Sequence, residues 1–353
     1  MNYYQRHDAV INDQQLLLNF IDLAKQRGLH PDKLLKGTKI FYQDLPKKFQ
    51  PYSPQTLLTI IENCSKHVNA HDISFLLGRR YFPLHLGTLG QALMNCRHLA
   101  DMLRVCQCFQ VMIFPLMSIE LKHFNNNTHI IFTSAVGALS ARQEIFLSEF
   151  LLSSLLGAVK YRCQNFPELS IHLAYDEVNH IEQYQSHITS LNTKLYFQQK
   201  ISMLSIATPL LYKPFNDSSL SLKAMALSQI KAQIKAQAKT QNDGQARISF
   251  MQAATQYITK QLMQQQALSL AHCAQHFGYS SATFKRKLAD HNVSYQSLLD
   301  AVRGQQAIFQ LIIYQHSNEE IATSLDFTDV SNFRKAFKRW TGMTPSNMRA
   351  QVC

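Results

Sequence analysis

Apolar residues recur at intervals of three and four along much of the chain, which is the spacing of amphipathic helices. A first helix is predicted after Asn12-Asp13, which can cap it, and Gly28 can end it. A second begins at Ser53-Pro54, where a capping serine precedes a proline at the first helical position. Helical spacing returns from Leu99 to Phe109.

The pattern changes to alternation of apolar and polar residues further along, which favours strands. The segments SIELKHF (118–124) and HIIFTSA (129–135) flank three asparagines, 125–127, which can form the turn of a hairpin. Further strands are predicted at 169–175, around 195–197 and at 203–206. This mixture of helices and strands predicts an α+β domain that ends near Phe215.

After this domain the spacing of apolar residues is again that of a helix. Leu220, Leu227 and Ile234 lie seven residues apart. Because the heptad is short, we favour a helix docked on its own domain over the coiled-coil seam of a dimer. The polar run 240–244 breaks the pattern and is predicted to be a linker. The expected organisation is therefore an α+β domain (1–222), a helix and linker (223–245) and an all-helical domain (246–353).

The helical domain contains a unit, about 268–290, in which a short apolar helix is followed by a tight turn and a basic helix. Gly278 can take the positive φ of the turn, and Ser280 can cap the second helix. Phe284 and Leu288 are four residues apart and are expected to face the first helix. This is the pattern of a helix-turn-helix, whose second helix enters the major groove of DNA.

A second unit, about 317–341, repeats this pattern, with Ser281 and Val330 as corresponding positions 49 residues apart. Ser317 and Glu320 form a capping box. The side chains expected to point inward are Ile321, Ala322, Leu325, Phe333, Phe337 and Trp340. One long helix, Tyr295 to Tyr314, is predicted to hold both basic helices on one face, so that they enter successive major grooves about 34 Å apart.

The stretch IATSLDFTDVSNFRKAFKRWTGMTPSNMR, preceded by AVRGQQAIFQLI, resembles the DNA-binding domain of the AraC/XylS family of bacterial transcription regulators. The resemblance spans about Ala253 to Arg349. The segments GTLGQAL and SLNTKLYFQQKISMLSIATPLLYKPF resemble the N-terminal ligand domain of one branch, that of arabinose-binding type in regulators like the ornithine-utilisation regulator. One departure is Asp326, where the family usually has glycine; Asp tolerates a left-handed backbone, so we expect the turn to survive.

Positions on the exposed face of each basic helix give the expected DNA contacts. The candidates for base contacts are Ser281, Ala282, Lys285 and Arg286 in the first unit, and Val330, Ser331, Asn332, Arg334 and Lys335 in the second. Lys285 and Arg286 can donate to guanine, Ala282 can offer a methyl contact, and Asn332 can pair with adenine. Family members often read bases less strictly through the second unit. Phosphate contacts are expected from Ser280, Lys338 and Thr344.

Composition agrees with a polyanionic partner. The 353-residue chain carries a net charge of +12, and in 246–353 eleven Lys and Arg stand against six Asp and Glu. With 46% hydrophobic residues a sizeable core can be buried. We expect no secretory signal, because no apolar run follows the first residues, and the apolar stretch 145–159 is too short and too polar to span a bilayer. Seven scattered cysteines suit reduced thiols in a cytoplasm. The family resemblance implies a bacterial, nucleoid-associated protein.

The pairs His67/His71 and His272/His276 have a spacing that can bind zinc, but they lack the glutamate of zinc hydrolases. Cys106 and Cys108 are interpreted as core thiols. A DNA-repair methyltransferase can carry an AraC-like unit, but the reactive PCHR-type cysteine that it needs is absent. We expect no catalytic residue, no metal and no cofactor.

Two interpretations stay open for side chains of the first domain. The large apolar residues can line an effector cavity or form plain core, and the second is favoured: Phe109, Met112, Phe114, Met117, Phe146 and Phe150. The basic residues can meet a carboxylate effector or be surface charges: Arg79, Arg80, Arg142 and Lys160. An organic acid, an amino acid or a fatty-acid-like molecule is implied by the resemblance alone.

The sequence thus predicts a mainly α protein, with an α+β N-terminal domain followed by an all-α domain in which a long helix joins two helix-turn-helix units. The expected function is a non-enzymatic, sequence-specific regulator of transcription, most simply an activator. Its expected partners are double-stranded promoter DNA, a small-molecule effector, RNA polymerase and a second copy of itself, without a membrane. An architectural or RNA-binding protein using the same basic face is the alternative.

Overall fold

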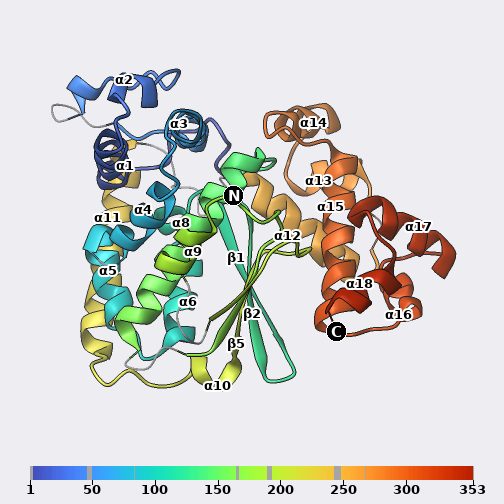
Figure 1. Ribbon diagram of the computed structural model, residues 1–353. Coiled ribbons are helices and arrows are strands. Elements are labelled where there is room, and N and C mark those ends of the chain that lie inside the picture. Colours follow the sequence, from blue (N-terminus) through green and yellow to red (C-terminus); the bar gives the residue numbers. More distant parts are fainter. Residues whose placement is uncertain are drawn as a thin grey trace. The chain divides into compact units, whose positions relative to one another are not determined.

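The computed structural model describes residues 3–45, 50–82, 84–163, 167–188, 193–241, 248–266 and 268–352 (Figure 1). The chain divides into two compact units. The N-terminal unit comprises Met1–Ala135 and Leu139–Ile248, and the C-terminal unit comprises Val136–Ala138 and Ser249–Cys353. Residues 242–244 of the predicted linker lie outside the described residues.

The N-terminal unit is mainly helical. Its α-helices are α1 (Gln14–Gln26), α2 (Pro31–Leu34), α3 (Pro54–His67), α4 (Ile73–Tyr81), α5 (Gly87–Met94), α6 (Leu99–Cys108), α7 (Gln110–Ile113), α8 (Ala141–Arg162), α9 (Ile181–His187), α10 (Thr208–Leu211) and α11 (Leu220–Gln241), with 3₁₀ turns η1 (Tyr42–Asp44) and η2 (Leu84–Leu86). The predicted caps are confirmed, because Asp13 accepts a hydrogen bond from the Leu16 amide and Ser53 from that of Thr56.

A five-stranded mixed sheet forms the second layer of this unit. Its strands are β1 (Met117–Phe124), β2 (Asn127–Ser134), β3 (Leu169–His172), β4 (Thr193–Tyr196) and β5 (Met203–Ala207), in the order β1-β2-β5-β3-β4. All neighbours are antiparallel except β3 and β4, which are parallel. The predicted hairpin is confirmed, with a turn of two residues rather than three: Asn125 (φ 45°) and Asn126 (φ 63°) take the positive φ of a type I′ turn.

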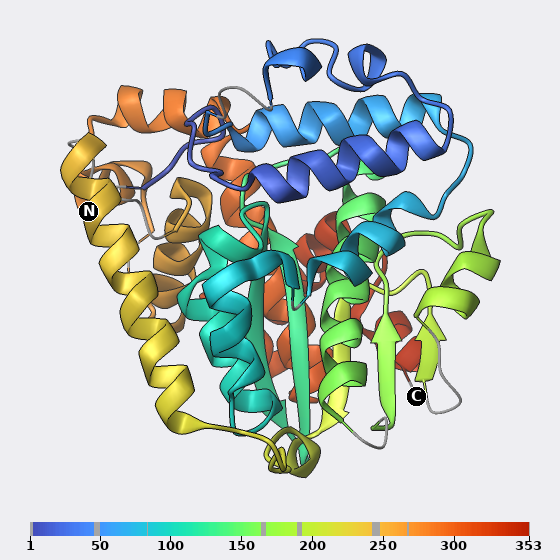
Figure 2. The ribbon, with the colours of Figure 1, turned by 90° about the vertical axis from the view of Figure 1, so that its left-hand side faces the viewer.

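The long helix α8 lies at the centre of the unit, against one face of the sheet (green in Figure 2). It is buried on nearly all sides, which explains why the apolar stretch 145–159 has no single apolar face. Its closest neighbour is α4, and Gly78 permits the approach. A Cβ atom on Gly78 would lie 2.5 Å from the carbonyl oxygen of Phe150 and 2.7 Å from Cβ of Ser153.

Helix α11 packs against α5 within the N-terminal unit, as the docked interpretation predicted. Within residues 220–235 of this helix, the buried residues are Ala226 and Ile230, four apart, at 1% exposure each. Leu220 of the heptad is 56% exposed, so the buried stripe differs from the one that the seven-residue spacing predicted. Leu222 and Met225 are also exposed, at 49% and 51%.

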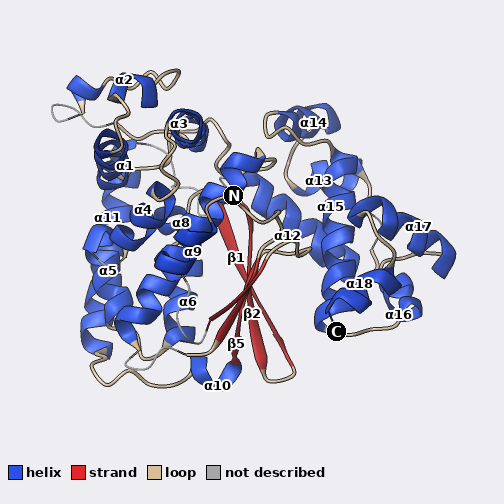
Figure 3. Ribbon diagram, viewed as in Figure 1, coloured by secondary structure: helices blue, strands red, loops and turns tan. Residues whose placement is uncertain are grey.

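The described part of the C-terminal unit contains helices and no strand (Figure 3). Its elements are α12 (Phe250–Met263), α13 (Leu270–His276), α14 (Ser281–Ala289), α15 (Tyr295–Ile308), the π-helical turn η3 (Phe309–Ile313), α16 (Asn318–Ser324), α17 (Val330–Thr341) and α18 (Pro345–Val352). The predicted long helix 295–314 is thus an α-helix that ends in a π turn. In Figure 1, α13 and α14 lie at one end of α15, and α16, α17 and α18 lie towards its other end.

Candidate nucleic-acid interface and ligand cavities

The first helix-turn-helix is formed by α13, a tight turn and α14. Gly278 has a φ of 72°, and the Tyr279 amide donates to the Ala274 carbonyl across the turn (2.8 Å). Ser280 caps α14 by accepting from the Thr283 amide. Phe284 is fully buried, which leaves the opposite side of α14 to solvent. The sequence prediction for this unit is confirmed in its turn, its cap and its buried face.

The second helix-turn-helix, α16 to α17, repeats these devices with one residue more in its turn. Asp326 takes the left-handed place, with a φ of 62°, and the Phe327 amide donates to the Ala322 carbonyl (2.9 Å). The cap of α17 is Asp329, so two residues separate the left-handed residue from the cap, whereas Tyr279 alone does so in the first unit. The expectation that Asp326 preserves the turn is confirmed.

A capping box opens α16 as predicted. The Ser317 hydroxyl accepts from the Glu320 amide, and the Ser317 amide donates to Glu320 Oε2 (2.6 Å). The hydrogen bond that the Ser317 amide donates to the carboxylate, and then the interaction of the carboxylate with the Ser317 side chain, hold the pKa of Glu320 below its ordinary value. Ile321 and Ala322 are buried, so α16 offers its apolar side to α17.

The basic side chains lie on the solvent side of both second helices. Lys285 and Arg286 of α14 are exposed, and so are Arg334, Lys335 and Lys338 of α17. Among the described residues, no carboxylate lies within ion-pair distance of these five cations. Two other cations are engaged: Lys287 lies 5.0 Å from the Tyr279 ring centroid, and Arg339 bonds to Asp300 (3.3 Å).

The remaining candidates for DNA contacts are small polar or apolar side chains near the helix starts. Those exposed are Ser280, Ala282, Ser331 and Asn332, and those half-buried are Ser281, Val330 and Thr344. Thr344 caps α18 by accepting from the Asn347 amide. Asn332 donates its side-chain amide to Asp329 (2.6 Å), so it must leave this carboxylate before it can pair with a base.

Trp340 is half-buried, so the prediction that it lies in the buried face of α17 was only partly right. Phe333 and Phe337 are fully buried. The indole lies against Phe327, with centroids 5.8 Å apart, and against Gly304 of α15. A Cβ atom on Gly304 would come within 3.2 Å of the Trp340 Cβ, so a small residue is required where α15 and α17 meet.

Asp326 is a position where side-chain shape decides stability. A β-branched residue strongly disfavours positive φ, whereas glycine accepts it freely. We expect Asp326→Val to lower the free energy of unfolding of the C-terminal unit by about 1–2 kcal/mol, and Asp326→Gly to change it by less than about 0.5 kcal/mol. Urea titrations followed by Trp340 fluorescence measure both changes. Equal midpoints for the two variants would show that this turn is unstrained.

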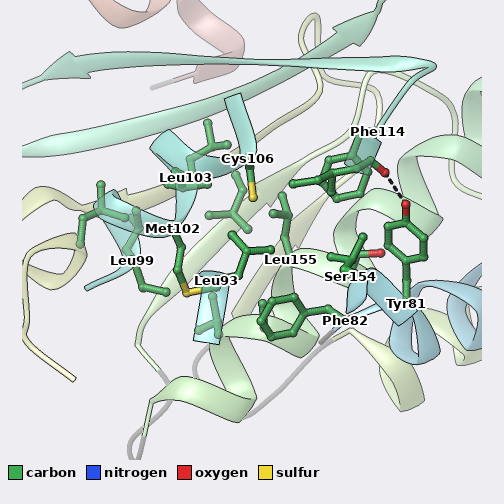
Figure 4. Close-up of a pocket in the computed structure, with 18 of the residues that line it drawn as sticks. Tyr81, Phe82, Leu93, Leu99, Met102, Leu103, Cys106, Phe114, Ser154 and Leu155 are labelled. Atoms are coloured by element: carbon green, nitrogen blue, oxygen red, sulfur yellow. Dashed lines mark hydrogen bonds between the residues drawn. The ribbon is translucent and has the colours of Figure 1, made fainter. Parts of the chain in front are cut away.

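An apolar cavity lies between the sheet and the helices of the N-terminal unit (Figure 4). Its lining includes Phe114 and Leu155, and its few polar groups are occupied: the Tyr81 hydroxyl donates to the Ile113 carbonyl (2.8 Å). Burial raises the pKa of the Cys106 thiol to about 12, so this side chain is uncharged. The cavity encloses about 50 Å³, far less than the roughly 150 Å³ that holds a benzene ring. At this volume the cavity is a packing void within the core and is too small for a ligand the size of benzene.

The residues predicted to bind an effector do not come together in one site. Phe114 lines the apolar cavity, and Phe150 packs beside it against Tyr81. Phe146 and Arg142 line a second cavity, which is mainly apolar but includes Glu149, while Met112, 37% exposed, lines a groove along α1 and α11. Phe109 is half-buried at the end of α6. Arg79 is exposed, and its guanidinium contacts His187 (3.2 Å).

Sequence reasoning missed the most unusual polar group of the unit, Glu149, which is 3% exposed in the middle of α8. Glu149 lines the second cavity together with His180. The signal was present, because an acidic residue interrupts the apolar stretch 145–159. A charge inside a buried helix requires partners, which lie elsewhere in the chain.

The described part of the chain contains neither a cluster of metal-ligating side chains nor a membrane-spanning helix. No group of three or more His, Cys, Asp or Glu side chains there is placed to hold a metal ion. The ring of His276 stacks on Tyr257, with centroids 3.8 Å apart. No described helix is both long enough and apolar enough to cross a membrane.

Two helix-turn-helix units with exposed basic second helices define a DNA-binding regulator of transcription. The sequence matches the family described as "Arabinose-binding domain of AraC transcription regulator, N-term" over residues 28–215 and the helix-turn-helix domain family over residues 249–351. The chain therefore belongs to the AraC family of transcription regulators, and its N-terminal unit is a ligand-binding domain of that family.

Individual curated relatives resemble part of this chain. The ornithine utilization regulator of Pseudomonas aeruginosa is 40% identical over 80 residues, which is 23% of this chain and 24% of that protein. The regulator GadX of Escherichia coli O6:H1 is 35% identical over 78 residues, 22% of this chain and 28% of its own. The chain thus spans about a quarter of the length of the curated relatives that it matches.

Solved structures also resemble the chain. The crystal structure of the transcriptional regulator CdpR from Pseudomonas aeruginosa aligns over 98% of this chain and 99% of its own, at 18% identity and a TM-score of 0.45. A DNA-binding transcriptional dual regulator from Escherichia coli K-12 aligns over 28% of this chain and 87% of its own, at 27% identity and a TM-score of 0.26.

Proposed function

We propose that this protein is a sequence-specific activator of transcription whose affinity for promoter DNA is controlled by a small molecule bound to its N-terminal unit. The observation that carries the DNA-binding part is the repetition of one device: a left-handed turn residue, a capped second helix, a buried apolar pair and an exposed basic face. In this proposal α14 and α17 enter successive major grooves on one side of the duplex.

Base reading is assigned to the exposed side chains at the start and middle of each second helix. Lys285 and Arg286 donate to guanine O6 and N7, and Ala282 and Ser281 contact neighbouring base edges. In α17 the readers are Arg334, Lys335 and Asn332, flanked by Val330 and Ser331. The lack of acidic partners within ion-pair distance among the described residues supports the assignment for the cations, because nothing there must be displaced before they bind DNA.

Phosphate contacts are assigned to Ser280, Lys338 and Thr344. Phosphate contacts fix the position of the protein on the duplex without selecting sequence. Ser280 and Thr344 both cap helices, so their backbone surroundings present amide donors that suit an anion.

The assignment is tested by two variants that remove one cation each. Arg286→Ala should reduce the preference for the specific site over a scrambled duplex roughly 5- to 150-fold, which corresponds to about 1–3 kcal/mol. Lys338→Ala should weaken binding to both duplexes equally and reduce the slope of log affinity against log salt by about 0.9. Fluorescence anisotropy titrations at several salt concentrations measure both quantities.

The specific duplex comes from footprinting promoter fragments of the operon next to the coding sequence. A discrete footprint that survives about 0.15 M salt separates sequence-specific binding from architectural or RNA binding, because non-specific affinity falls steeply with salt. The two substitutions should not reduce sequence preference and salt dependence to the same extent. If they do, the division into base-contacting and phosphate-contacting residues is wrong.

Control by an effector requires that the small molecule bind two arrangements of the protein with different affinity. We propose that the relevant arrangements differ in how two copies of the chain present their DNA-binding units, so that the protein acts as a homodimer. The exposed apolar side chains Leu222 and Met225 of α11 support a contact between copies. Recruitment of RNA polymerase in the cytoplasm completes the proposed role.

A further inference from the structure

Glu149 is the centre of a buried polar cluster that joins three helices of the N-terminal unit. Its side chain is 4% exposed. Oε1 accepts from the Tyr184 hydroxyl (2.9 Å) of α9 and lies 2.8 Å from Nε2 of His180, while Oε2 accepts from the Ser74 hydroxyl (2.6 Å) of α4. The His71 ring stacks on that of His180, with centroids 4.5 Å apart and ring planes 9° apart.

The hydroxyl donors around Glu149 are neutral and have fixed directions. Burial and then the neighbouring Tyr175 hydroxyl and Glu149 raise the pKa of Tyr184 far above its ordinary value, so this hydroxyl keeps its proton. Since Tyr184 donates that proton to Glu149, the Tyr175 hydroxyl, 2.8 Å away, donates to Tyr184. Among the described residues no lysine or arginine lies within ion-pair distance of Glu149, and the basic side chain that does is His180, with Nε2 2.8 Å from Oε1.

The cluster borders a cavity. Ser74, His71, Glu149 and His180 line about 180 Å³ of space together with Ala70. A cavity of roughly 150 Å³ accepts a benzene ring, so this one has room for about six to ten non-hydrogen atoms. Each carboxylate oxygen has two acceptor positions, and Oε2 accepts one hydrogen bond, so one position is left for a ligand.

The outer wall of the cavity carries the opposite charge. Arg142 also lines it, and its side chain is 56% exposed and bonded to Glu62 (3.2 Å). An anionic ligand would therefore meet a solvated guanidinium that already has a partner, but the buried end of the cavity would repel it. A cation would gain a desolvated carboxylate, where the electrostatic interaction is strongest.

We propose that this cavity binds a small organic cation of the primary ammonium type, with its ammonium group against Glu149 and Ser74 and its apolar part towards Ala70. This inference rests on the proposed control of the protein by a small-molecule effector and names the chemical class of that effector. It differs from the sequence-based suggestion of a carboxylate effector bound by Arg79 or Arg142.

The test uses the full chain and two pairs of probes matched in shape: benzylamine with benzyl alcohol, and n-butylamine with n-butanol. Both amines are protonated at pH 7. Calorimetric titration and thermal shift are expected to show binding of at least one amine, with an affinity at least tenfold higher than that of its alcohol. Benzoate is expected not to bind.

Two variants tie the binding to this cavity. Glu149→Gln keeps the shape of the side chain and removes its charge, and Ala70→Leu fills the cavity while the carboxylate stays. Each is expected to weaken amine binding at least tenfold. The inference is overturned if neither amine binds or if the alcohols bind as tightly as the amines. It is also overturned if either variant folds normally, judged by circular dichroism, and still binds the amine as tightly as the parent protein.

The same samples separate this inference from the proposed function. Site-specific promoter binding by a protein that binds neither amine overturns the cation site and leaves DNA recognition in place. An amine that binds through Glu149 without changing promoter affinity contradicts effector control by this site, and the cation site stands.

Discussion

Replacing Phe337 with alanine is expected to lower the free energy of unfolding of the C-terminal unit by about 3–5 kcal/mol. Phe337 is fully buried in α17, 5.6 Å from the Phe333 ring, so truncation leaves a cavity that the rigid helices around it cannot fill. The chain has a single tryptophan, Trp340, in the same helix. A urea titration followed by tryptophan fluorescence therefore reports the unfolding of this unit.

The matched control is Lys335→Ala in the same helix. Lys335 is exposed, so its truncation should leave the free energy of unfolding within about 0.5 kcal/mol of the parent value. If the two variants unfold at the same urea concentration, α17 is not held by its aromatic face, and the rigid presentation of its basic side chains loses its physical basis.

The second large effect is expected at Gly78, where α4 meets α8. The Cβ atom of Gly78→Ala would lie 2.5 Å from the Phe150 carbonyl oxygen, a backbone atom that cannot rotate away. The two helices must therefore separate, and we expect a loss of about 1–3 kcal/mol in the stability of the N-terminal unit. Faster amide hydrogen exchange in peptides from α4 and α8 would reveal the loss.

Gly157 of α8 provides the control, because a Cβ atom there meets no heavy atom within 4 Å. Gly157→Ala should slow hydrogen exchange slightly, since alanine in a helix interior is favoured over glycine by about 0.5–1 kcal/mol. Opposite signs for the two glycine substitutions are the expected result. A neutral Gly78→Ala would mean that the helices are further apart than described.

The C-terminal unit could be predicted from the sequence because its signals are local. A capping serine such as Ser280, the apolar pair Phe284 and Leu288, and a residue that tolerates positive φ each act within one or two helical turns. The same rules identified Asp326 as a substitute for glycine in the second turn. The fold and the exposed basic faces of the DNA-binding unit followed from such short-range patterns.

The N-terminal unit was predicted less completely because its decisive contacts are long-range. Strands β3 and β4 were recognised as apolar segments, but their parallel pairing depends on chain connections that alternation does not encode. The cluster around Glu149 joins residues as far apart as Ser74 and Tyr184. Such a group leaves no periodic pattern in the sequence. The one sequence feature that indicated it is the acidic residue within an apolar helix.

The π turn at Phe309–Ile313 affects how the second helix-turn-helix is rotated relative to the first. A π turn accommodates one residue more than the α-helix around it, and each residue of an α-helix advances the azimuth by about 100°. Deleting a single residue there would turn α16 and α17 by roughly a quarter of a revolution relative to α13 and α14. The rotation of the second helix-turn-helix relative to the first therefore depends on the number of residues in this turn, which joins α15 to α16.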